Sequence, residues 1–397
     1  MFKLYRYLFP GVIALVLGFR LGTILLIRPA PVFDEPFHLQ VTQQFGPGLP
    51  AISQLRDYPS AAGPFFYILF GNLGALLGHN LTLLRVAVFA LALGNLFLYF
   101  RIVRRSLPGE NPMTALALLA TAPYFAVLAG VFMTEHLALF LGLAALLCYL
   151  RFRDAGRPAD AVLSLLFATL AIHTRVYYAF LPLTFAATTL TDRRSSSPLP
   201  SSLLPPLSSL IWLLPLVAFL PMVFLWRGFA PPFFQYAYHP AFSWQNTSSI
   251  LLWSGFIFLP WVWHKLKPWD LLALLAIPAI LLAPLPGLGI TRSALKLLPH
   301  PLALVIACLF GAIGLLWYIR LVPFTLRSGT RVAAIGTLIL VIGLLVSGPM
   351  VYERYLLPGI PLMLICARPD TKPRLALAWA CLFQLPLALA HILHLAN

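Results

Sequence analysis

The first polar segment of this chain, residues 31–67, places several ionisable side chains just after a long apolar opening. Asp34, Glu35 and His38 stand within five consecutive positions, and Asp57 occurs later in the same segment. An ionised group next to hydrocarbon is costly unless it is paired, hydrated or functional. A carboxylate in such a place can act as a general base when a substrate hydroxyl group reaches it. We therefore interpret this segment as a candidate active-site loop.

The helices around this loop are predicted to be transmembrane. Hydrophobic residues make up 60% of the 397 positions and charged residues only 10%, with a mean hydropathy of +0.89. Apolar runs recur from Phe9 to the C-terminus and leave no room for an ordinary soluble domain. This pattern is typical of a polytopic helical membrane protein. We predict an all-α bundle of about 13 spans, the third of them at about residues 113–131, forming a single domain over residues 1–397.

The basic residues predict how the chain is oriented, because cytoplasmic loops retain lysine and arginine. The groups assigned to the cytoplasm are Lys3 with Arg6; Arg101 with Arg104 and Arg105; Arg151 with Arg153 and Arg157; Arg193 with Arg194; Lys265 with Lys267; Arg320 with Arg327 and Arg331; and Arg368 with Lys372 and Arg374. Neighbouring groups are separated by enough apolar sequence for two crossings. The N-terminus is therefore expected in the cytoplasm and the candidate loop on the extracytoplasmic side.

One apolar segment, Gly63–Gly78, is predicted not to cross the membrane. If it crossed, the group that begins at Arg101 would lie outside, and every later basic group would be inverted. We expect an interfacial helix or a re-entrant segment there, so that residues 31–82 form one outer loop with juxtamembrane helices.

Composition also argues against several other partners. The net charge of +16 is spread in small groups rather than along one polar face, so nucleic-acid binding is not predicted. The four cysteines all lie inside apolar runs without the spacing of a zinc site or of a disulfide framework. No paired metal-ligand spacing is present, and neither a metal nor a cofactor is predicted.

The few carboxylates divide between the two predicted sides. Those assigned to the cytoplasm as solvated loop charges are Glu110, Asp154, Asp160, Asp192, Asp270 and Asp370. Those assigned to the outer side are Asp34, Glu35, Asp57, Glu135 and Glu353. The outer cations are Arg28, Arg56, Arg85, Arg175, Arg227, Arg292, Lys296 and Arg354. A face that combines acids with excess cations suits a carboxylate base acting near a phosphate-bearing substrate.

The sequence motif of the first loop resembles that of a known family. Asp34-Glu35-Pro-Phe-His38, just after the first span, is similar to the first loop of C-type (GT-C) glycosyltransferases. It looks closest to the dolichyl-phosphate-glucose α-1,2-glucosyltransferase family. Asp57-Tyr-Pro59 and Gly63-Pro-Phe-Phe-Tyr67 resemble the segment that comes after this loop in the family. Glu353-Arg354-Tyr355-Leu-Leu-Pro358 resembles its late element in looser form.

This resemblance implies an integral GT-C enzyme that transfers a hexose, glucose or mannose, from a polyprenyl-phosphate donor. The acceptor would be a lipid-linked or envelope glycan, and the anomeric configuration would invert. Asp34 would be the general base, with Glu35 as its catalytic neighbour. The expected substrate-binding residues are His38, Asp57, Arg85, Glu135, Arg175, Glu353, Arg354 and Tyr355. The lipid-phosphate sugar is a co-substrate, and no separate cofactor is implied.

Structural roles stay open for several of these residues. Glu135 could contact the acceptor or a metal, or it could be a helix-end charge. Arg85 and Arg175 could bind phosphate, or each could extend its charged head to the membrane surface. His38 could assist the acid pair or serve the loop's own structure.

Two other classes of membrane protein fit the composition. A transporter or lipid flippase also needs many spans and buried charges, although transporters tend to place coupling residues at the bilayer midplane on repeated halves. A polymerase or ligase of lipid-linked oligosaccharides is also a membrane protein, but it is not expected to carry the sequence motif of the first loop.

Overall fold

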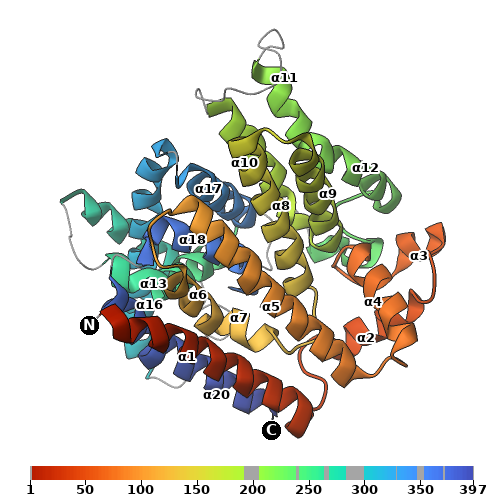
Figure 1. Ribbon diagram of the computed structural model, residues 1–397, viewed down its shortest axis with the longest axis horizontal. Coiled ribbons are helices and arrows are strands. Elements are labelled where there is room, and N and C mark those ends of the chain that lie inside the picture. The colour runs from red at the N-terminus through yellow and green to blue at the C-terminus, as the bar shows by residue number, and fades with distance from the viewer. Residues whose placement is uncertain are drawn as a thin grey trace.

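The computed structural model describes residues 2–191, 205–237, 241–262, 268–282, 299–327, 329–346, 353–369 and 372–396. The regular elements within these ranges are helices (Figure 1), which confirms the predicted all-α class. The outer loop at Pro286–His300, with Arg292 and Lys296, lies outside the described residues except for its last two positions. Glu353 is described in its backbone but not in its side chain.

Long apolar helices make this chain a multi-pass membrane protein. Six helical stretches are long and apolar enough to span a bilayer: Tyr7–Ile27, Leu81–Ser106, Glu135–Ala155, Ser208–Trp226, His300–Leu326 and Pro373–His394. Five shorter apolar helices accompany them: Pro64–Leu76, Pro112–Thr121, Pro158–Thr174, Val176–Thr191 and Arg331–Leu345. These lengths agree with the helical membrane bundle predicted from hydropathy.

The individual elements follow the chain in a simple order. The helices of the first half are α1 (Phe2–Gly22), α2 (Glu35–Gln44), α3 (Ile52–Asp57), α4 (Pro64–Leu76), α5 (Leu81–Ser106), α6 (Pro112–Thr121), α7 (Pro123–Leu128), α8 (Glu135–Ala155), α9 (Pro158–Thr174) and α10 (Phe180–Thr191). Those of the second half are α11 (Pro205–Leu210), α12 (Leu214–Trp226), α13 (Trp244–Val262), α14 (Ala276–Leu282), α16 (His300–Leu321), α17 (Arg331–Leu345), α18 (Gly359–Ala367), α19 (Pro373–Trp379) and α20 (Leu385–Ala396). Short helical turns join them, including η1 (Thr23–Ile27), η2 (Val176–Ala179), η4 (Pro232–Ala237) and η7 (Glu353–Leu356).

The third predicted span differs from expectation. A continuous helix over about residues 113–131 was expected, but the chain forms α6 and α7 with a break at Ala122. Ala122 precedes Pro123 and has an extended ψ of 122°. Proline disfavours helical backbone in the residue before it and cannot donate to the preceding turn. The hydropathy of residues 113–131 therefore predicts an apolar segment correctly but does not indicate the break at Ala122.

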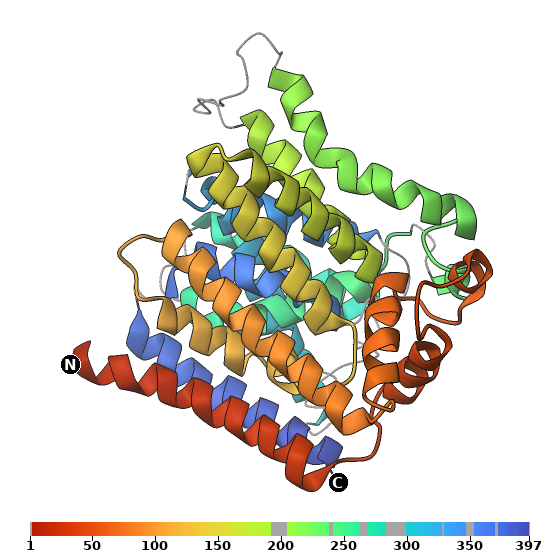
Figure 2. The same cartoon turned by 45° about the vertical axis from the view of Figure 1, so that its right-hand side comes forward.

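The candidate loop lies across one end of the bundle. In Figure 2 the segment α2–α4 sits beyond the ends of α5, α8 and α9 rather than alongside them, and the chain leaves α1 and enters α5 at that same end. Helix α4 packs on α2 and on the end of α9, where Gly63 N–H donates to the Thr174 carbonyl at 3.0 Å. A Cβ at Gly63 would stand 2.0 Å from the His173 carbonyl oxygen, so this approach requires glycine.

Ion pairs at the two ends of the bundle follow the predicted partition of charges. Acids assigned to the cytoplasm pair with arginines assigned to the same side: Arg105–Asp154, Arg151–Asp160 and Arg368–Glu110. Acids assigned to the outer side likewise pair with arginines assigned there: Arg56–Asp57, Arg85–Glu35, Arg175–Glu135 and Arg354–Asp34. Helices α1 and α20 lie side by side, with the N- and C-termini at opposite ends of that pair (Figure 2).

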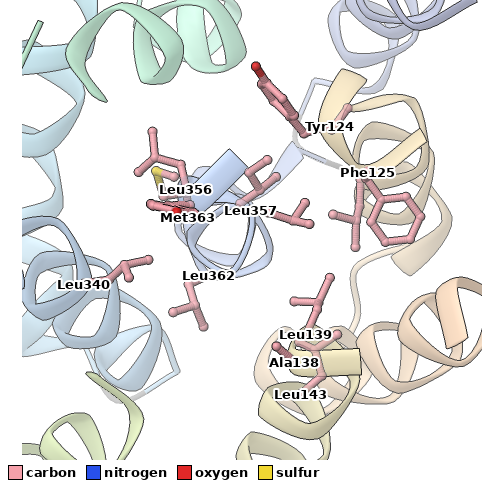
Figure 3. Packing of buried hydrophobic residues seen from close by; sticks show 14 of the residues in the cluster. Tyr124, Phe125, Ala138, Leu139, Leu143, Leu340, Leu356, Leu357, Leu362 and Met363 are labelled. Atoms are coloured by element: carbon pink, nitrogen blue, oxygen red, sulfur yellow. The ribbon is translucent and has the colours of Figure 1, made fainter. Parts of the chain in front are cut away.

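The core that supports the loop is assembled from α7, α8, α17 and α18. Figure 3 shows Phe125, Leu139 and Leu340 from three of these helices converging on the segment that includes Leu356 and Leu357. The last two side chains are fully buried. Because they directly follow Arg354 and Tyr355 in the sequence, their burial fixes η7, and with it the arginine, at the end of the core that faces Asp34.

Candidate functional site

Asp34 stands at the start of α2 with its side chain directed away from its own helix. It occupies the N-cap position, yet its carboxylate makes no capping hydrogen bond. Its backbone carbonyl accepts from His38 N–H at 2.8 Å. Its Oδ2 instead accepts from Nη2 of Arg354 at 3.0 Å, and the side chain is 52% exposed. An exposed carboxylate next to one cation can accept a proton from a bound hydroxyl group and release it to water.

Glu35, the next residue, is placed quite differently. Its side chain is fully buried, and Oε1 accepts from Nε of Arg85 at 2.9 Å and from Phe132 N–H at 2.6 Å. Oε2 accepts from Nη2 of Arg85 at 2.5 Å and from Val32 N–H at 2.9 Å. Four donors thus surround the carboxylate. In this geometry Glu35 holds the loop against α5 and the α7–α8 connection.

Arg85 completes this buried clamp. Beyond Glu35 it donates to the carbonyl oxygens of Pro29 and Ala30 at 2.7 and 3.1 Å, and its side chain is 2% exposed. All three nitrogens of the guanidinium thus donate to oxygen atoms of the protein. The sequence left open whether Arg85 binds phosphate or has a structural role; in the structure it joins the entry of residues 31–82 to α5.

A second buried acid, Glu135, lies on the far side of Arg354 from Asp34. Glu135 begins α8 and is 1% exposed; its Oε1 accepts from Nη2 of Arg175 at 2.7 Å and lies 3.4 Å from Nε of Arg354. The N-terminus of α8 also favours a negative charge there. Glu135 therefore holds two arginines that arrive from the end of α9 and from η7.

Arg354 links the two acids. Its Nε faces buried Glu135, its Nη2 faces exposed Asp34, and its Nη1 lies 3.9 Å from the Met133 sulfur. The Tyr355 ring lies beneath it, with the guanidinium carbon of Arg354 and that of Arg175 each 5.8 Å from the ring centroid. We call Asp34, Arg354, Glu135 and Arg175 the charged tetrad.

His38 lies one helical turn after Asp34 and borders the tetrad. Burial, and next the Arg175 guanidinium, lower the pKa of His38 to about 3, so the ring is neutral at ordinary pH. Its Nδ1 is 2.7 Å from the Tyr67 hydroxyl, which lies 2.5 Å from the Ser60 hydroxyl. This chain of contacts fixes the orientation of the imidazole ring.

The structure brings together most of the predicted site residues. Asp34, Glu135, Arg175, Arg354 and Tyr355 meet at the end of the bundle, with His38 beside them. Asp57 is placed apart, on α3, where it is 52% exposed and pairs with its neighbour Arg56. Among the described residues, no group of three or more His, Cys, Asp or Glu side chains is arranged to hold a metal ion.

Some contributors were not predicted from the sequence. Tyr67 and Ser60 orient His38, and Met133 lies against Arg354. Tyr177 packs on Tyr355 with ring centroids 5.1 Å apart. Tyr67 was within the quoted loop motif, but nothing in the spacing indicated that it would contact His38.

Comparisons with known proteins give a limited likeness. Neither a family model nor a curated protein matches this sequence. Among solved structures, the chain is similar to the crystal structure of ArnT from Cupriavidus metallidurans bound to undecaprenyl phosphate. The identity is 16% and the TM-score 0.43, covering 94% of this chain and 77% of that one. The apo-state structure of the same protein gives a TM-score of 0.41 with equal identity and coverage. Similarity this low carries no functional argument, so the role of the site has to be argued from its own residues.

Proposed function

We propose that this protein is a membrane glycosyltransferase of the GT-C type that uses a polyprenyl-phosphate sugar. One observation carries the proposal: the half-exposed carboxylate of Asp34 lies 3.0 Å from a guanidinium that is itself held by buried Glu135. A proton acceptor and a phosphate-binding group thus stand together at one end of an apolar bundle. A lipid phosphate sits at headgroup level, where this end of the bundle is predicted to lie.

The chemistry needs one base and one group that stabilises phosphate. Asp34 accepts the proton of the acceptor hydroxyl, whose oxygen forms a bond to the anomeric carbon of the sugar. The bond from that carbon to the phosphate oxygen breaks, and its electron pair stays on the phosphate. Attack from the opposite face inverts the anomeric configuration. The proton then passes from Asp34 to water. We assign this proton transfer to Asp34 alone, because the carboxylate of Glu35 is enclosed by protein donors.

Arg354 is the proposed phosphate ligand. The donor phosphodiester carries one negative charge and the released lipid phosphate gains a second, so a fixed cation stabilises the transition state more than the ground state. A guanidinium can donate two parallel hydrogen bonds to phosphate. Arg175 adds a second positive charge on the other side of Glu135.

The sugar and the acceptor are proposed from the resemblance of the first loop. That resemblance favours glucose or mannose as the hexose and a lipid-linked or envelope glycan as the acceptor. A transporter is the rival function. The tetrad lies at the ends of α8 and α9 and in η7, whereas coupling residues of transporters tend to lie at the bilayer midplane.

Transfer of labelled sugar tests the proposal. Membranes containing the protein are incubated with radiolabelled polyprenyl-phosphate glucose or mannose, and radioactivity is measured in lipid and glycan fractions. Wild type should transfer label, and Asp34→Asn should lower the rate by about 10²–10⁴ at an unchanged protein level. Near-normal turnover in Asp34→Asn would reject this residue as the base. Movement of intact solute across vesicles without any transfer would favour the transporter.

A further inference from the structure

The contact between Asp34 and Arg354 conflicts with an inverting reaction in which both residues take part. In such a displacement the acceptor oxygen and the leaving phosphate stand on opposite faces of the anomeric carbon. Inverting glycosidases correspondingly keep their two working carboxyl groups about 6.5–9.5 Å apart. The Nη2 atom that lies 3.0 Å from Asp34 cannot hold the base and the leaving phosphate at the same time in that arrangement. One contact of Arg354 has to change.

We propose that the phosphate of the donor displaces Asp34 from Arg354, and that this displacement frees Asp34 to act as the base. The inference rests on the function proposed above and adds a coupling between donor binding and base activation. Until phosphate arrives, Nη2 of Arg354 occupies Oδ2 of Asp34, an oxygen that has to be open to the acceptor hydroxyl group.

The geometry shows which contact of Arg354 gives way. The partner of Nη2, Asp34, is half exposed, so its carboxylate is hydrated again when this contact opens. The partner of Nε, Glu135, is buried and remains neutralised by Arg175. A phosphate that competes for Nη2 therefore replaces the weaker contact while Nε stays on Glu135.

Tyr355 allows the guanidinium of Arg354 to rotate when this contact is replaced. Its ring faces the guanidinium of Arg354 at 5.8 Å, and a cation–π contact depends less on rotation in the ring plane than a hydrogen bond does. The ring itself is fixed, since it packs on Tyr177 and is 8% exposed. Arg354 can thus pivot over a stationary ring.

Chemical labelling of Asp34 tests this coupling without requiring transfer activity. Hydrophobic carbodiimides react with carboxyl groups, and a carboxyl group held by a guanidinium is less open to the reagent than one that has been released from it. Full-length protein in detergent is treated with dicyclohexylcarbodiimide in the presence of farnesyl phosphate or of uncharged farnesol. Labelled peptides are quantified by mass spectrometry. Farnesyl phosphate should raise the labelling of Asp34 severalfold, and farnesol should not raise it.

Asp57 supplies an internal control. It has the same type of side chain, the same 52% exposure and its own arginine partner, Arg56, but lies outside the tetrad. Its labelling should not respond to farnesyl phosphate. If labelling rose equally at Asp34 and Asp57, the cause would be the lipid–detergent mixture rather than Arg354, and the proposal would be overturned.

Two variants complete the experiment. Arg354→Gln should label strongly at Asp34 without any lipid, and farnesyl phosphate should add nothing. Arg354→Lys retains the charge and serves as the alternative if the glutamine variant fails to fold. It should show a basal labelling of Asp34 between those of wild type and Arg354→Gln. If farnesyl phosphate binds, measured as thermal stabilisation, but leaves Asp34 labelling of wild type unchanged or lowered, the coupling is refuted and the phosphate site stands. If farnesyl phosphate does not bind at all, the proposed function fails with it.

Discussion

Asp34 and Glu35 are adjacent in sequence but meet opposite environments, and this contrast predicts different consequences of substitution. Glu35→Gln would leave the Arg85 guanidinium as an uncompensated buried charge. Loss of one partner of a buried ion pair costs about 3–5 kcal/mol. We expect a marked fall in thermal stability and protein level, measured in detergent by a fluorescence melting curve. The matched control is Arg56→Gln, which removes an exposed pair and should leave the melting temperature unchanged; equal losses would contradict the structural role of Glu35.

Arg354 offers a direct test of the phosphate ligand. Arg354→Lys keeps a positive charge but loses the planar fork, and an ammonium group cannot bridge phosphate and Glu135 as a guanidinium can. We expect a clear fall in kcat/KM for the lipid-phosphate donor at a normal protein level, measured by initial rates over a range of donor concentrations. Wild-type kinetics in this variant, together with loss of donor use on substitution of Arg292 or Lys296, would move the phosphate site to the loop at 286–300.

His38 predicts a dependence of stability on pH. Its pKa is about 3 in the folded protein, chiefly because of burial, against about 6.5 in an unfolded chain. Below pH 6.5 the unfolded state therefore binds a proton that the folded state does not. The stabilisation is complete above about pH 6.5 and declines as the pH falls toward 3. The melting temperature of His38→Gln should fall less than that of wild type when the pH is lowered from 7.5 to 5. An identical loss in both proteins would show that other groups cause the acid sensitivity.

Among the elements, the pair α13 and α16 shows how glycine permits close packing in this bundle. A Cβ at Gly255 would stand 1.7 Å from the Phe310 carbonyl oxygen, and one at Gly314 would stand 2.0 Å from that of Leu251. Small residues let membrane helices approach closely in this way. The two helices therefore depend on both positions remaining free of side chains.

Substitution of one glycine tests this packing. Gly255→Ala should force the helices apart and lower the melting temperature by several degrees, because backbone cannot yield as a flexible side chain does. Gly11→Ala in α1 is the control, since nothing lies within 4 Å of a Cβ there. It should be neutral or slightly stabilising, as alanine favours helix over glycine. A tolerated Gly255→Ala would mean that this contact is looser than described.

The side of the membrane on which residues 31–82 lie determines the orientation of the entire bundle. The four native cysteines lie in apolar helices, so single cysteines at Ser53 and Asn80, both exposed, can be labelled selectively in intact cells with a membrane-impermeant maleimide. Ser60 is unsuitable because its side chain is buried. Both positions should react from outside, since the chain enters and leaves this loop at one end of the bundle. Labelling from opposite sides would mean that α4 crosses the membrane.

Local features of the sequence were enough to predict the class of this protein and the grouping of its charges. Apolar length and the placement of arginine between apolar runs are local properties, and they sufficed to predict a helical membrane bundle. They also separated acids such as Asp34 and Glu135 from those paired at the other end, such as Asp154. The break at Ala122 was missed, because hydropathy over a long window does not register a single proline.

Which acid meets which arginine depends on the tertiary structure. Glu35 finds Arg85 across 50 positions, Glu135 finds Arg175 across 40, and Asp34 finds Arg354 across 320. Such pairs arise from the packing of α5, α8, α9 and η7 at one end of the bundle, and spacing in the sequence does not encode that packing. The same packing buries Glu35 and exposes Asp34, because consecutive residues at a helix start face different directions.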